Sequence, residues 1–142
     1  MSNSYRDLVV WQAAIELVTR IYRTTDSFPK QETYGLTAQI RRAAVSVPSN
    51  IAEGQGRNSA REFLQFLGHA RGSLVEVETQ LFIACNLAYI TREQRSALLE
   101  ESDRVSRLLN GLMLSLKKRQ AELEKPETKN EKLYRKGAVA NG

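Results

Sequence analysis

Apolar residues recur three or four positions apart along four long stretches of the chain, which is the spacing of one face of an α-helix. The stretches cover about residues 7–27, 34–53, 59–89 and 91–124. Their apolar stripes contain, in chain order, Leu8, Trp11, Ala14, Ile15, Val18, Ile21 and Tyr22; Leu36, Ile40, Ala43, Val47 and Ile51; Phe63, Leu67, Ala70, Leu74, Val77, Leu81, Ala84 and Ala88; and Leu98, Val105, Leu108, Leu109, Leu112 and Leu116. No stretch carries a strand signal, and short turns make consecutive helices antiparallel. The sequence therefore predicts an all-α fold, namely an up-down-up-down antiparallel four-helix bundle.

Polar residues form a second line beside the apolar stripe on the two central helices. The line on the second helix is Gln39, Arg42, Ser46, Asn50 and Glu53, and the line on the third is Glu62, Gln65, His69, Ser73, Glu76 and Gln80. We expect the two lines to face each other at the edge of the core, with Arg42 and Glu76 forming an ion pair. The predicted polar seam consists of Gln39, Arg42, Ser46, Asn50, Glu53, Ser73 and Glu76. The alternative is that both lines are ordinary solvated faces.

A glycine-rich connection, residues 54–59, separates these two helices. Glycine can adopt the left-handed conformation that ends a helix, and Ser59 with Glu62 is typical of a capping box at the start of the next one. Pro48 lies inside the second helix, where proline lacks an N–H and clashes with the preceding turn, at a cost of about 3 kcal/mol. A break would put the stripes out of phase, and they keep their phase. The sequence therefore predicts one continuous helix that is kinked at Pro48.

Two glycines, Gly68 and Gly72, lie one turn apart on the third predicted helix. Together they cost about 2 kcal/mol of helix propensity. Such a cost suggests that the absence of a side chain is needed, so we expect another backbone to approach closely there.

The net charge of +5 comes mostly from the end of the chain. Residues 117–142 hold eight basic and four acidic residues, whereas residues 1–116 hold 13 basic and 12 acidic ones. The polar, aperiodic residues 126–142 are predicted to be a basic, disordered tail that follows a four-helix-bundle domain over residues 1–125. Because the body is nearly neutral, charge alone is a weak argument for nucleic-acid binding by the whole protein.

Bulk features also bear on the compartment. The chain has no apolar run of 18 residues, so no membrane-spanning helix and no membrane partner are expected. Its first residues lack the basic and apolar regions of a secretory signal. Cys85 is the only cysteine and cannot form an internal disulfide, which is typical of a reducing environment. We therefore expect a cytoplasmic protein.

The residues of common catalytic and metal sites are missing. A di-iron bundle needs two Glu-x-x-His pairs, but His69 is the only histidine and has no glutamate three positions before it. Zinc sites, phosphate-binding glycine loops and serine-hydrolase elbows have no matching motif. Ser73, His69 and Glu76 share one helix face, but no oxyanion-donating loop accompanies them. The sequence therefore predicts no catalytic residue, no metal, no cofactor and no small-molecule substrate, and we expect that the protein is not an enzyme.

Three segments carry a resemblance to a known family: YRDLVVWQAAIELV, YGLTAQIRRAAVSVPSNIAEGQGR and HARGSLVEVETQL. They resemble the four-helix-bundle proteins named after open reading frames in intervening sequences of bacterial 23S ribosomal RNA genes. The resemblance covers about residues 5–116, and SVPSNIAEG is its most specific part. It is closest at Gln39, Arg42, Ser46, Pro48, Asn50, Glu53, Gly54, Ser73 and Glu76.

The resemblance implies a homopentamer, with five bundles packed side by side around a central channel. The family is similar in fold to the accessory variability proteins of diversity-generating retroelements, which bind a reverse transcriptase and its RNA. Tyr5, Trp11 and Tyr22 are more aromatic residues than the core of a narrow bundle needs. In a pentamer they could lie between subunits, because aromatic residues favour interfaces. These three residues are the predicted oligomer interface.

A pentamer would also multiply a modest positive charge. Residues 34–71 contain five arginines against two glutamates, and five copies of that excess would attract phosphates. The candidate nucleic-acid-binding residues are Arg41, Arg57, Arg61, Arg71, Lys117, Lys118 and Arg119. The leading hypothesis is a non-enzymatic oligomeric scaffold that binds RNA or an RNA-binding protein. The alternative is a protein–protein adaptor with no nucleic-acid role.

Overall fold

Four α-helices make up most of the part of the chain that the computed structural model describes, residues 4–124. They are α1 (Val9–Thr25), α2 (Leu36–Gln55), α3 (Ala60–Asn86) and α4 (Arg92–Leu123), with short 3-10 helices at Tyr5–Asp7 and Lys30–Glu32. No strand occurs within residues 4–124, which confirms the predicted all-α fold of four helices. The predicted tail, residues 126–142, lies outside the described residues.

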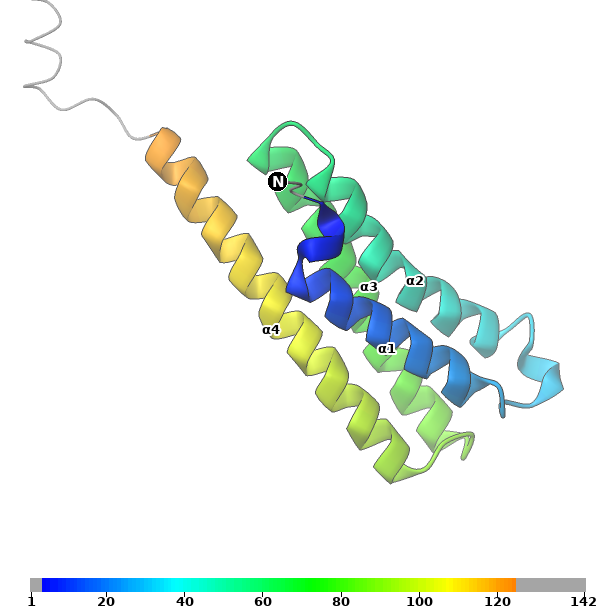
Figure 1. The fold of residues 1–142 in the computed structure, drawn as a ribbon. Helices are drawn as coiled ribbons and strands as arrows, with labels where there is room; N and C mark the ends of the chain where they lie inside the picture. The colour runs from blue at the N-terminus through cyan, green and yellow to red at the C-terminus, as the bar shows by residue number, and fades with distance from the viewer. Residues whose placement is uncertain (1–3, 125–142) are drawn as a thin grey trace, which may run out of the picture.

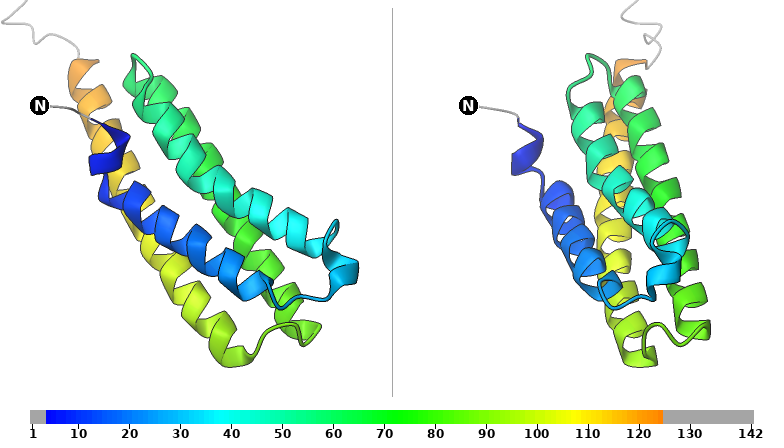
Figure 2. Two further views of the ribbon diagram at one scale, coloured as in Figure 1. Left: turned by 45° about the vertical axis from the view of Figure 1, so that its right-hand side comes forward. Right: turned by 90° about the vertical axis from the view of Figure 1, so that its right-hand side faces the viewer.

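Each helix packs against two others, and the four form a closed ring (Figures 1 and 2). α2 contacts α1 and α3, whereas α4 contacts α3 and α1. The α2–α3 pair is antiparallel, because Ser46 and Ser73 meet near the middle of both helices and Gly54, at the end of α2, meets Phe63 at the start of α3. The polar lines on α2 and α3 are thereby brought to the same side of one helix pair.

The core is built from the stripes that the apolar periodicity predicts on α2, α3 and α4. Its largest fully buried residues are Leu17, Ile21, Ile40, Val47, Ile51, Leu67, Leu74, Val77, Leu81, Leu98, Val105 and Leu109. On α1 the buried face is rotated from the predicted one. Leu17 is buried, while Ile15 and Tyr22 are exposed. The predicted α1 stripe is confirmed at Ala14 and Ile21, which are fully buried, and wrong at Ile15 and Tyr22. Apolar residues cover more than half of the circumference of α1, so their pattern does not specify which part is buried.

α2 continues as one α-helix through Pro48, and Pro48 itself is buried. The predicted left-handed glycine in the α2–α3 turn was wrong, since Gly56 has a φ of −77° and no glycine in the described chain has a positive φ. A four-residue turn, in which the Arg57 amide donates to the Gly54 carbonyl, ends the helix instead. Ser59 caps α3 by accepting the Glu62 amide.

The left-handed conformation occurs at Ala88, with a φ of 62°, just after α3. There the Tyr89 amide reaches back to the Ala84 carbonyl and the Ala88 amide to the Cys85 carbonyl. Within residues 4–124, none of the helices combines the length and the apolar character needed to cross a bilayer.

Candidate functional site

The polar lines of α2 and α3 meet at two serines. The Ser73 hydroxyl donates to the Ser46 hydroxyl oxygen at 2.8 Å, and the Asn50 amide donates to the same oxygen at 2.9 Å. Asn50 also donates to the Ser46 carbonyl at 2.8 Å. All three residues are half-buried. Three of the seven predicted seam residues therefore form one hydrogen-bonded group at the α2–α3 interface.

The predicted ion pair between Arg42 and Glu76 was wrong. The two residues lie across a hollow from each other, both are exposed, and neither takes part in an ion pair within the described chain. Because both charged groups are solvated, an ion pair between them would gain little over water and would cost side-chain entropy.

The same hollow holds two amides from opposite helices. Gln39 is exposed, whereas Gln80 is buried and its Oε1 atom has no hydrogen-bond partner within residues 4–124. Glu53, the last predicted seam residue, is exposed and pairs with Arg57 on its own side of the turn, at 3.0 Å. The predicted seam is thus hydrogen-bonded between the helices at Ser46, Asn50 and Ser73, whereas its other four residues are exposed to solvent.

At Gly54 the α2 backbone lies close to α3. A Cβ atom at this position would lie 2.8 Å from Cδ1 of Phe63 and 2.8 Å from Cβ of Phe66. The prediction of a close approach at Gly68 and Gly72 was wrong, because a Cβ atom at either position would meet nothing within 4 Å. These two glycines lie on the outer side of α3, away from the core.

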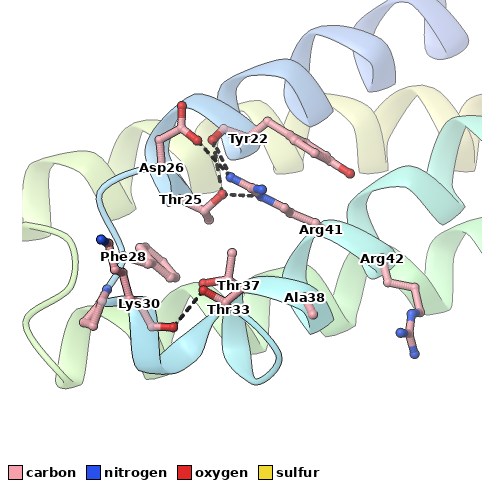
Figure 3. A pocket seen from close by; sticks show the side chains of 11 residues that line it. Tyr22, Thr25, Asp26, Phe28, Lys30, Thr33, Thr37, Ala38, Arg41 and Arg42 are labelled. Carbon is pink, nitrogen blue, oxygen red and sulfur yellow. Dashed lines mark hydrogen bonds and ion pairs between the residues drawn. The ribbon is translucent and has the colours of Figure 1, made fainter.

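Arg41 joins the end of α1 to α2. Its guanidinium donates to the Thr25 hydroxyl at 2.9 Å, the Tyr22 carbonyl at 3.2 Å and the Asp26 carboxylate at 3.1 Å. It also lies over the Tyr22 ring, 4.6 Å from the centroid (Figure 3). The sequence suggested Arg41 as a nucleic-acid-binding residue, whereas the structure shows four contacts through which it joins α2 to the end of α1.

The other candidate RNA-binding residues differ in how far they are engaged. Arg57 pairs with Glu53 and lies 4.8 Å from the Phe66 ring centroid. Arg71 donates to the Asn110 side chain at 3.3 Å. The remaining candidates are exposed and make no ion pair with the described residues: Arg61, Lys117, Lys118 and Arg119.

The aromatic residues predicted as an interface lie in two places. Tyr5 and Trp11 pack edge to face, with their ring centroids 5.2 Å apart, beside an apolar groove between α1 and α2. Val18, Val45 and Pro48 also line the groove. Tyr22 lies in a different hollow, at the other end of α1, under the Arg41 guanidinium.

That second hollow lies between the end of α1 and the start of α2 and has a volume of about 490 Å³. Figure 3 shows its side chains. Sequence reasoning missed this hollow, because three of its lining residues, Lys30, Thr33 and Thr37, sit in or next to an irregular connection with no motif. The only signal was a cluster of hydroxyl and basic residues between the two helices.

The serine, histidine and glutamate that share one face of α3 are not joined to one another. The Ser73 hydroxyl donates to Ser46, and His69 is exposed beside the Phe66 ring. Among the described residues, no group of three or more His, Cys, Asp or Glu side chains could hold a metal ion.

The surroundings of Tyr89 raise the proton affinity of its hydroxyl. Its hydroxyl donates to the Glu32 carboxylate at 3.2 Å, which links the end of α3 to the α1–α2 connection. Partial burial, together with this carboxylate, raises the pKa of Tyr89 above its ordinary value of 10.0.

Comparison with known proteins gave a family and a fold relative. The model of a family described as 23S rRNA-intervening sequence protein matches residues 6–111. The chain is also similar to the crystal structure of a protein of unknown function from Bacteroides thetaiotaomicron, assigned to the S23 ribosomal protein family. The TM-score is 0.67 at 28% identity, over 74% of this chain and 98% of the other. Comparison with curated protein sequences gave no match.

Proposed function

The chain belongs to the 23S rRNA-intervening sequence protein family, and from this premise we propose that it is a cytoplasmic, non-enzymatic scaffold that binds RNA, or a protein–RNA assembly, through basic surface. In this proposal the protein is an up-down-up-down bundle, kinked at Pro48, that assembles into a homopentamer. The RNA-binding surface is the end of the bundle where the α2–α3 turn and the last turns of α4 lie together.

The observation that carries the proposal is the position of the unpaired basic residues. Ser102 bonds to Glu78 and Arg71 bonds to Asn110, so lower-numbered residues of α3 lie beside higher-numbered residues of α4. Arg61 is therefore level with the end of α4, where Lys117, Lys118 and Arg119 are found. Figures 1 and 2 show the α2–α3 turn and the end of α4 at the same end of the molecule. Basic residues distant in sequence thus gather at one end, which we name the basic end.

The charge of one chain is modest at the basic end, because four glutamates (Glu53, Glu62, Glu122 and Glu124) lie among its basic residues. The sequence beyond residue 124 starts there and adds five basic and two acidic residues. Repetition around a five-fold axis would multiply the excess, and attraction to a phosphate backbone grows with the number of cations that contact it.

Exposed apolar side chains support self-association. Val75, Phe82 and Ile83 on α3, and Leu87 just after it, are each at least 44% exposed. Contacts between copies of the chain would bury such side chains and the groove beside Tyr5 and Trp11. A pentamer predicts a mass in light scattering of about five times the 16.0 kDa of the chain.

The RNA-binding proposal is tested by charge reversal at two places. The double variant Arg61→Glu/Lys118→Glu alters the basic end, and Arg104→Glu/Arg107→Glu makes the same change in charge on the α1–α4 face, where acidic residues surround the arginines. Electrophoretic mobility shifts with total bacterial RNA, at increasing salt, should show steeply salt-dependent binding by the native protein. The first variant should lose binding and the second should keep most of it. Equal losses, or binding that salt does not weaken, would exclude the basic end as the RNA site.

The apolar groove favours a second candidate, a protein–protein adaptor. A partner helix would bury its apolar side chains against Trp11 and Pro48 without any nucleic acid. Affinity purification with and without nuclease separates the two functions. Partners that survive nuclease treatment, and that Trp11→Ala removes, would favour the adaptor.

A further inference from the structure

The hollow between α1 and α2 carries an excess of positive charge. Lys30, Arg41 and Arg42 line it against one carboxylate, that of Asp26, which Arg41 already binds. Glu32 is not part of the lining, and its carboxylate accepts a hydrogen bond from the Tyr89 hydroxyl. The lining residues therefore have a net positive charge, although Figure 3 shows the Arg42 guanidinium pointing away from the other lining side chains.

The start of α2 opens into the same hollow. The first backbone hydrogen bond of this 20-residue helix runs from the Gln39 amide to the Gly35 carbonyl, so the amides of Leu36, Thr37 and Ala38 have no acceptor within the helix. Serine and threonine side chains cap α3 and α4, but the residue that precedes α2 is Gly35, which has no side chain to do so. Free amides and the helix dipole both favour an anion at such a position.

Thr37 supplies an independent sign of a ligand. Its side chain lines the hollow, the residue is only 8% exposed, and its hydroxyl makes no hydrogen bond to the residues that the structure describes. The two neighbouring threonines are different, because Thr25 donates to the Ile21 carbonyl and Thr33 to the Lys30 carbonyl. Figure 3 shows Thr37 inside the ring of side chains that surrounds the hollow. The residue is nearly buried but its hydroxyl oxygen is not among the fully buried unpaired atoms, so the oxygen is open to the hollow and can donate or accept there.

From these three observations we propose that the hollow binds a phosphate group. An ammonium, the Arg41 guanidinium, a hydroxyl and backbone amides are all donors, and the several oxygens of one phosphate can accept from many donors at once. With a volume of about 490 Å³ and an opening to solvent, the hollow admits a phosphate that is attached to a larger molecule. The site lies at the opposite end of the bundle from the basic end (Figure 1), so it does not depend on the proposed function.

The direct test is titration of the purified full-length protein with inorganic phosphate at low salt, by isothermal titration calorimetry. The native protein should bind phosphate saturably. Thr37→Val keeps the shape and removes the hydroxyl, so it should weaken binding roughly tenfold, the usual effect of losing one hydrogen bond to a charged group. Thr37→Ser restores the hydroxyl and should restore binding, and Lys30→Glu should abolish it.

The matched controls are Thr79→Val, at an exposed threonine of α3, and Lys118→Glu, at the basic end. Both should bind phosphate as the native protein does, and circular dichroism melts should show that every variant is folded. If the native protein shows no saturable binding, or if Thr37→Val and Lys30→Glu bind as tightly as it does, the proposal is wrong.

Two further ligands identify the source of the phosphate. If the phosphate belongs to an RNA end, a 5′-phosphorylated oligoribonucleotide should bind more tightly than its 5′-hydroxyl form, and Thr37→Val should remove the difference. If it belongs to a free nucleotide, a nucleoside monophosphate should compete with inorganic phosphate while the two oligonucleotides bind equally. Either result supports the site. Because Arg61→Glu/Lys118→Glu should leave phosphate binding unchanged, failure of RNA binding at the basic end is distinguishable from failure here.

Discussion

Replacing Gly54 with alanine tests how closely α2 and α3 pack at their joined end. The new methyl group would lie 2.8 Å from atoms of Phe63 and Phe66, although ordinary contacts are 3.4–4 Å. The Phe63 ring can turn away, but the Phe66 atom is a Cβ and moves only with the α3 backbone. The helices must therefore separate, which costs about 1–3 kcal/mol for an overpacked core. Alanine favours the helix over glycine by about 1 kcal/mol, so we expect the free energy of unfolding to fall by about 1–2 kcal/mol in total.

Gly68→Ala is the matched control, because it makes the same chemical change on a helix with nothing within 4 Å of the new methyl group. Only the gain in propensity applies there, so this variant should be more stable by about 0.5–1 kcal/mol. Thermal denaturation followed by circular dichroism should show opposite shifts, of roughly 2–4 °C per kcal/mol. A Gly54→Ala protein as stable as the native one, or a destabilised Gly68→Ala protein, would refute the described packing.

Three other predictions follow from single contacts. Arg41→Leu should lower the free energy of unfolding by about 1–3 kcal/mol, because it removes three hydrogen bonds that join α2 to the end of α1. The adjacent Arg42→Leu should change it by less than about 0.5 kcal/mol, because Arg42 is exposed. Urea denaturation measures both variants, and equal losses would contradict the described contacts. Ser73→Ala should cost about 1 kcal/mol in the same assay, and no change would mean that water replaces the bond. The raised pKa of Tyr89 favours the protonated hydroxyl in the folded state, so its contribution to stability is complete below pH 10.0 and is lost as the pH rises through the raised value. Tyr89→Phe should therefore weaken the alkaline loss of stability, and an unchanged profile from pH 9 to 11 would show that Tyr89 does not contribute to it.

The helices could be predicted from the sequence because apolar periodicity is a local signal. Three of the four predicted stripes identify the buried face of their helix. Ile40, Leu74 and Leu109, one from each of these stripes, are at most 1% exposed. The stripe on α1 could not be placed, because Ile15 and Tyr22 fit the same spacing as the buried residues. Only contacts with the other helices decide which side of such a helix is buried.

The side-chain pairing of the site was less predictable. Spacing put Ser46 and Ser73 in two polar lines that face each other, but it could not show which residues would meet, nor whether Arg42 would prefer Glu76 or water. A helical glycine marks either a close approach or an open surface, and the rings that make Gly54 a close approach come from another helix. The phosphate site lies next to an irregular connection, where no periodicity applies, so no spacing could have indicated it.

The central claim of the functional proposal is that the basic end contacts RNA. Ultraviolet cross-linking of the purified protein to RNA, followed by mass spectrometry of the cross-linked peptides, tests it most directly. We predict cross-links in the peptides that contain residues 57–61 and 117–119. Cross-links confined to the α1–α4 face around Arg104 and Arg107, or no cross-linked peptide at all, would contradict the claim.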